Sequence, residues 1–225
     1  MPIAAPIERP GVKRREPLIC GALAGAQCLL LAYLLHLSVH ASAGVALLAG
    51  LPLALLCHEL LARRGDRRGV QLTVVMFAAG GFGLMLGCIA DFGSLGLYGM
   101  LGMCRSWSAG GIWPTPEQLW AKVNVMPWAS LGMMVGGNVG VALGVVHPRA
   151  RPVGGAFETY VLCNLGMLVG MVTAEQLATR LALDFDPIAA GVAMVAAMLL
   201  GMILGMNALL AAARALRFLS ASPAR

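Results

Sequence analysis

The sequence predicts an all-α fold: a polytopic membrane protein built as a six-helix transmembrane bundle, with a short interfacial helix in its outer loop. Of the 225 residues, 59% are apolar and 12% are charged, whereas a soluble domain has about 45–50% and about 25%. So few charges cannot cover a surface that faces water, which excludes a soluble single domain. The apolar stretches are continuous rather than alternating, which favours helices over the strands of a membrane β-barrel.

Six apolar stretches are long enough to cross the hydrocarbon core, which takes roughly 20 helical residues at about 1.5 Å each. We expect the first to be a retained span rather than a cleaved signal, because a signal has an apolar run of only about 7–15 residues. The expected organisation is a cytoplasmic tail at 1–17, a transmembrane domain at 18–213 and a second cytoplasmic tail at 214–225. The spans are expected at about 18–38, 43–62, 70–92, 124–146, 155–179 and 187–212, with an outer loop at 93–123.

The basic residues predict which side each loop faces, because cytoplasmic loops of membrane proteins are enriched in Lys and Arg. All but three of the 16 Lys and Arg residues fall in the two tails and in the two loops that this topology places beside them. The three exceptions are Arg105, Lys122 and Arg180. We therefore expect a bacterial-type inner (plasma) membrane protein with both termini in the cytoplasm. The net charge of +6 reflects this asymmetry, so it gives no reason to expect nucleic-acid binding.

The outer loop carries the pattern of the interfacial helix. All four tryptophans lie in or beside it, and indole rings favour the membrane–water interface. Thr115, Pro116 and Gln118 fit a capping box with proline at the first helical position. We expect a helix from about residue 116 that lies on the outer leaflet and runs into the fourth span. The alternative is a lid over an outward-facing vestibule.

Glycines recur at every fourth position on most of the expected spans. The fourth span has three consecutive GxxxG steps, from Gly132 to Gly144. Small residues let helix backbones approach closely in lipid, and this contact drives their association. We expect the fourth span at the bundle centre or at an interface between copies. Partners, in a homo-oligomer or a membrane complex, would use the Gly-rich faces of spans four to six. Further pairs are Gly21/Gly25, Gly83/Gly87, Gly166/Gly170 and Gly201/Gly205.

Methionine and cysteine follow single helical faces, because residues four apart lie one above the other. Thioether and thiolate sulfur selects Cu(I) over hard cations, although methionine is also a flexible filler of cores. The candidate metal-binding residues occur on three spans and in the outer loop. They are Met85, Cys88 and Asp91 on the third span, Met100, Met103 and Cys104 in the loop, Cys163, Met167, Met171 and Glu175 on the fifth span, and Met194, Met198, Met202 and Met206 on the sixth.

Two of these candidates are carboxylates near the outer ends of their spans. A carboxylate at the bilayer centre costs about 2.5–3.5 kcal/mol, and less near the interface, so its presence indicates a function. Asp91 and Glu175 would supply negative potential at the mouth of a cation path. For Glu175 the alternatives are contact with headgroups and pairing with Arg180. His36 and His40, one turn apart on the first span, are a further candidate metal pair.

Three functions remain open. The first is a carrier or delivery protein for a soft metal ion, with copper as its only cofactor. The second is a non-catalytic structural or assembly subunit of a membrane complex. The third is a small-solute or sulfur-anion transporter, in which Cys88 and Cys163 matter most. The chain has no phosphate-loop, CxxC, HExxH or GxSxG motif, so we expect no enzyme activity. The metal hypothesis requires the methionine faces to point into a shared interior rather than toward lipid.

Overall fold

The computed structural model describes the chain in five stretches, at 15–62, 68–107, 114–142, 156–181 and 186–221. Every regular element in these stretches is a helix, which confirms the predicted all-α class for this part of the chain. The elements are α1 (Arg15–Leu34), α2 (Val39–Val45), η1 (Ala46–Gly50), α3 (Leu51–Ala62), α4 (Arg68–Val75), η2 (Met76–Gly80), α5 (Gly81–Phe92), α6 (Gly96–Trp107), α7 (Pro116–Val125), α8 (Pro127–Ala142), α9 (Ala156–Leu181) and α10 (Pro187–Ala221).

Five helical segments are long and apolar enough to cross a membrane, which indicates a multi-pass integral membrane protein. The expected fourth span, at 124–146, is not among them. Its helix α8 has 16 described residues, about 24 Å of helix against a hydrocarbon core of about 30 Å. Residues 143–146 lie outside the described stretches. The five segments are Pro17–Leu34, Val39–Leu61, Leu72–Phe92, Phe157–Leu181 and Ile188–Ser220.

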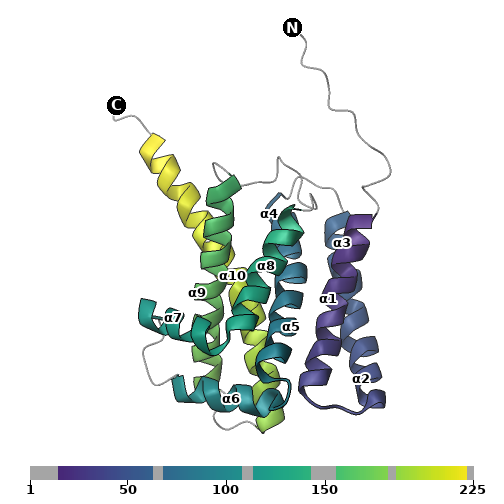
Figure 1. The fold of residues 1–225 in the computed structure, drawn as a ribbon. Helices are drawn as coiled ribbons and strands as arrows, with labels where there is room; N and C mark the ends of the chain where they lie inside the picture. The colour runs from purple at the N-terminus through teal and green to yellow at the C-terminus, as the bar shows by residue number, and fades with distance from the viewer. Residues whose placement is uncertain (1–14, 63–67, 108–113, 143–155, 182–185, 222–225) are drawn as a thin grey trace.

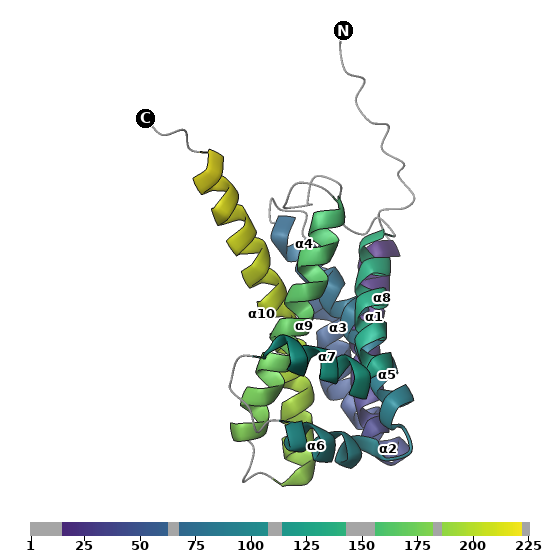
Figure 2. The same ribbon diagram turned by 60° about the vertical axis from the view of Figure 1, so that its left-hand side comes forward.

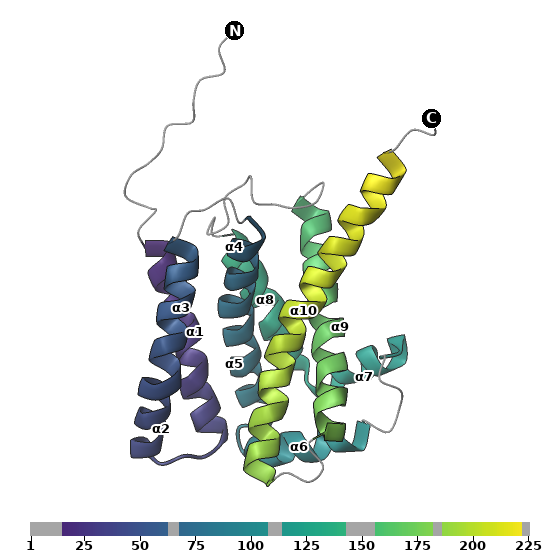
Figure 3. The ribbon, with the colours of Figure 1, turned by 180° about the vertical axis from the view of Figure 1, so that it is seen from behind.

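The helices form a bundle of side-by-side antiparallel rods. Figure 1 shows that the start of α1 and the end of α10 lie at the same end of this bundle, whereas α6 and α7 lie across it toward the opposite end. Turning the molecule shows α6 and α7 running past α9 and α10 (Figure 2). From behind, α1 and α3 form a pair at one edge, and the last turns of α10 extend beyond the other helices (Figure 3).

Helices α9 and α10 pack along the glycines that the sequence singled out. Gly166 and Gly170 of α9 face Gly205 and Gly201 of α10. A Cβ atom built on any of the four would lie closer than 3 Å to backbone atoms of the other helix. No side chain can be accommodated at such a distance, so the two backbones are in direct contact. This confirms the predicted role of these pairs in helix packing.

Glycine backbone contacts also join two other helix pairs. A Cβ on Gly83 of α5 would overlap the carbonyl oxygen of Gly132 of α8, and the reverse holds as well. In the second of these pairs, α1 and the α2–η1–α3 segment, a Cβ on Gly25 of α1 would lie 2.9 Å from the carbonyl oxygen of Gly50 in η1. The glycines described on α8, α9 and α10 thus pack within the chain. Gly144, the last of the fourth-span series, lies outside the described residues.

Two hydrogen bonds between polar side chains supplement the glycine contacts. The Asn164 amide of α9 donates to Asn138 Oδ1 of α8 at 3.0 Å. The Thr73 hydroxyl of α4 donates to Asn207 Oδ1 of α10 at 3.2 Å. Such bonds between membrane helices add modest stability and fix the rotation of one helix against another.

The described part of the expected outer loop contains two helices, α6 and the start of α7. The capping box is confirmed, because Gln118 N donates to Thr115 Oγ1 at 3.2 Å and Thr115 N donates to Gln118 Oε1 at 3.0 Å. However, α7 does not run into α8. The residue before a proline is kept out of the helical region, so the helix breaks at Met126, which has φ −125° and ψ 62°, and α8 starts again at Pro127. Helix α6, which brings Met100 and Cys104 into the core, was not predicted.

The predicted placement of His36 and His40 one turn apart on the first span is wrong. Helix α1 ends at Leu34, where His36 N donates to the Tyr33 oxygen and Leu37 N to the Ala32 oxygen. These two bonds form a Schellman motif, in which His36 takes the left-handed conformation with φ 51°. His36 and His40 are therefore not one turn apart on one helix.

Candidate functional site

Methionine is a main component of the buried core. Eleven of the 14 methionines are at most 1% exposed, although Met103 on α6 remains 36% exposed. The methionine faces of α9 and α10 therefore point into the protein, which is the condition that the metal hypothesis requires. The buried set is Met76, Met85, Met100, Met126, Met133, Met167, Met171, Met194, Met198, Met202 and Met206.

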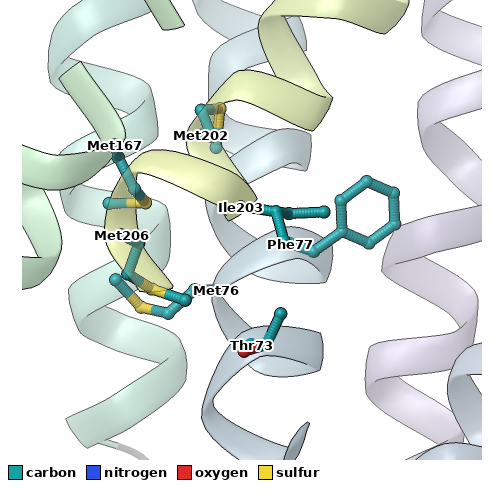
Figure 4. A pocket seen from close by; sticks show the side chains of 7 residues that line it. All are labelled: Thr73, Met76, Phe77, Met167, Met202, Ile203 and Met206. Carbon is teal, nitrogen blue, oxygen red and sulfur yellow. The ribbon is translucent and has the colours of Figure 1, made fainter. Parts of the chain in front are cut away.

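Four of these methionines line one recess between η2, α9 and α10 (Figure 4). The recess is partly open; the space among its side chains, open surroundings included, is about 160 Å³, and none of it is wide enough for a water molecule. The methyl groups of Met76 and Met167 also lie within 3.5 Å of the point where Gly137 of α8 would carry a Cβ. Three further residues complete the lining. The full set is Met76, Met167, Met202, Met206, Thr73, Phe77 and Ile203.

A π-helical turn carries Met76 to this recess. In η2 the backbone departs from regular α-helical hydrogen bonding, as is common at functional positions in helices. Gln27 of α1, which is buried, donates from Nε2 to the carbonyl oxygens of Phe77 at 3.0 Å and Ala78 at 3.1 Å. Gln27 thus holds the turn that positions Met76. Neither Gln27 nor Met76 was among the predicted site residues; the signal for Gln27 was a polar side chain inside an apolar span.

A second cluster lies where α6, α7 and α9 meet. Lys122 Nζ of α7 is 2.6 Å from Glu175 Oε1 of α9 and 3.4 Å from Cys104 Sγ of α6, and all three side chains are buried. Glu175 therefore forms an ion pair with Lys122, which was not among the predicted site residues. The second carboxylate oxygen, Glu175 Oε2, is buried and has no hydrogen-bond partner.

The electrostatics of this cluster keep its thiol neutral. Burial, together with the negative charge of Glu175, raises the pKa of Cys104 well above that of an ordinary thiol. Burial alone would lower the pKa of Lys122, but the Glu175 carboxylate more than offsets this effect and raises it. The raised pKa of Cys104 keeps its thiol protonated at neutral pH, and the raised pKa of Lys122 keeps its amine charged.

Asp91 of α5 binds the first turn of α8. Its carboxylate accepts hydrogen bonds from the backbone N–H groups of Trp128 at 3.3 Å and Ala129 at 2.9 Å. These are among the first N–H groups of α8, which have no partner within the helix. A negative side chain at a helix N-terminus contributes about 0.5–2 kcal/mol. Asp91 therefore caps α8 from the neighbouring helix α5.

Five of the predicted site residues lie in these two clusters. Met167, Met202 and Met206 line the recess, and Cys104 and Glu175 contact Lys122. Within the described stretches, no group of three or more His, Cys, Asp and Glu side chains is arranged to hold a metal ion. A metal site in this part of the chain would therefore depend on thioether sulfur. The other predicted residues outside these two clusters, apart from Met103 and Asp91, are buried in the core: Met85, Cys88, Met100, Cys163, Met171, Met194 and Met198.

No protein-family model, curated protein or solved structure matches this chain.

Proposed function

We propose that this integral membrane protein binds a soft monovalent metal ion, Cu(I), among the methionines of the recess and carries or delivers it. The observation behind the proposal is the convergence of four thioethers from η2, α9 and α10 on one water-free recess. Thioether sulfur is a neutral, soft ligand that favours Cu(I) over Zn²⁺, Mg²⁺ or Ca²⁺. No catalytic step is part of the proposal.

Buried methionines continue from the recess along both helices. Met194, Met198, Met202 and Met206 are one turn apart on α10, so they extend over about 18 Å along its axis. Met171 follows the recess on α9. An ion held by neutral ligands can pass from one thioether to the next by ligand exchange. The proposed path therefore follows the α9–α10 hairpin.

The proposed setting is a bacterial-type inner membrane with six spans, α8 included, and both termini in the cytoplasm. Two observations support it. The start of α1 and the end of α10 lie at the same end of the bundle (Figure 1). Most of the basic residues occur in the tails and loops assigned to that end, as expected for a cytoplasmic side.

Leucine substitutions in the recess test the proposal. We expect the triple variant M167L/M202L/M206L to fold but to lose copper that copurifies with the wild-type protein, measured by mass spectrometry of the metal per chain. Methionine-to-leucine exchange nearly conserves volume and costs less than about 1.5 kcal/mol per site. The matched control is M85L/M126L/M133L, three equally buried methionines outside the recess, which should keep its copper. Equal copper in both triple variants would contradict the recess as the site.

A second candidate function, a non-catalytic subunit of a membrane complex, is favoured by the outer face of the α2–η1–α3 rod. Only 6% of the most apolar window of Val39–Leu61 is buried, against 33–72% in the other four segments. Its exposed leucines include Leu48, Leu51, Leu55 and Leu56, so a partner helix could lie along them.

If a partner binds this face, L55W should reduce the amount of partner that copurifies in mild detergent. The control is L200W on α10, because Leu55 and Leu200 are 57% and 55% exposed. A protein that runs alone, or equal recovery with both variants, would exclude docking through this face.

A further inference from the structure

The ammonium of Lys122 occupies the one point where the buried sulfur of Cys104 and the buried carboxylate of Glu175 converge. Nζ lies 3.4 Å from Sγ and 2.6 Å from Oε1. The carboxylate still has an unused acceptor, because Oε2 has no hydrogen-bond partner although it is buried. Lys122 thus stands where a cation bound to this thiol and carboxylate would stand.

This point lies near one end of the row of buried methionines on α9 and α10. Gly166 packs on Gly205, and Gly170 on Gly201, so residues of α9 and α10 pair in opposite directions along the hairpin. Continuing this pairing toward the end of α9 places Glu175 at a level between Met194 and Met198. On α9 itself, Glu175 follows Met171 by one turn.

A cation in the methionine core needs a counter-charge. Thioethers are neutral, and an uncompensated charge is expensive away from water. Among the described residues, Glu175 is the one acidic side chain that is buried. Asp91 is already bonded to the amides of α8, and Glu158 forms an exposed ion pair with Arg217.

We propose that Glu175 is the counter-charge for the metal ion, and that Lys122 is an internal cation that holds this carboxylate until the ion replaces it. The inference rests on the proposed function. Cys104 adds a sulfur atom at the point of exchange. Lys122 can leave because its long side chain comes from α7, a short helix outside the five candidate spans.

The test measures binding of Ag(I), a soft monovalent ion, to the purified protein in detergent by calorimetry. We expect K122M to bind Ag(I) about tenfold or more tightly than wild type, because the carboxylate is then free of its competitor. We expect K122M/E175M, which removes both charges, to bind about tenfold or more weakly than wild type. E158Q removes a carboxylate at the other end of α9 and should bind as wild type does.

The K122M/E175M variant decides the question even if K122M fails to fold, because replacing a buried ion pair by apolar side chains is usually tolerated. Wild-type affinity in K122M/E175M overturns the role of Glu175 and leaves the metal site in the recess intact. Absence of Ag(I) binding by the wild-type protein overturns the proposed function, and the role of Glu175 with it.

Discussion

Replacing Gly170 with leucine is expected to separate α9 from α10 and to lower the free energy of unfolding by about 3 kcal/mol or more. A Cβ at this position would overlap the carbonyl oxygen of Gly201, which belongs to the backbone and cannot rotate away. The helices would have to move apart, and the methionines between them would lose their packing. Thermal unfolding in detergent measures the effect.

The control for this substitution is G102L on α6, where a Cβ would meet nothing within 4 Å. It should leave stability within about 0.5 kcal/mol of wild type, as is usual for exposed positions. Stability in G170L equal to that in G102L would show that the glycine contact does not hold the hairpin together.

Replacing Lys122 with methionine should lower the free energy of unfolding by about 3–5 kcal/mol, the usual effect of leaving a buried charge without its partner. Glu175 would remain buried, with no described hydrogen bond to either carboxylate oxygen. The double variant K122M/E175M should regain most of this stability, because neither charge is then buried.

Chemical denaturation of the three proteins in the same detergent gives the interaction energy of the pair. If the single and double variants lose the same stability, the ion pair does not couple α7 to α9.

Local patterns predicted much of this fold. The hydropathy of single stretches located five spans, and the glycine spacing identified the helix faces that meet. The capping box at Thr115 is a local signal too, and the structure confirms it. The fourth span is the exception, because its described helix is shorter than a bilayer-spanning helix.

The candidate site could be predicted only in part, because it depends on distant contacts. Met76 and Met85 are nine residues apart, which would place them on opposite faces of a regular α-helix. The π-helical turn η2 changes the angle between their side chains, and this could not be predicted from the spacing. Lys122 and Glu175 are 53 residues apart. Periodicity gives the face of one helix but not the direction in which that face points in the bundle.

The hydrogen bonds of Asp91 to α8 link the insertion of α8 into the membrane to the earlier synthesis of α5. In hydrocarbon, a backbone N–H without a partner costs several kcal/mol, and Asp91 on α5 accepts hydrogen bonds from the first free N–H groups of α8. Because α5 leaves the ribosome before α8, the acceptor is already in place when Pro127 emerges. We therefore expect α5 and α8 to enter the bilayer as a pair, and we expect a nascent chain halted before Pro127 to expose the glycine face of α5.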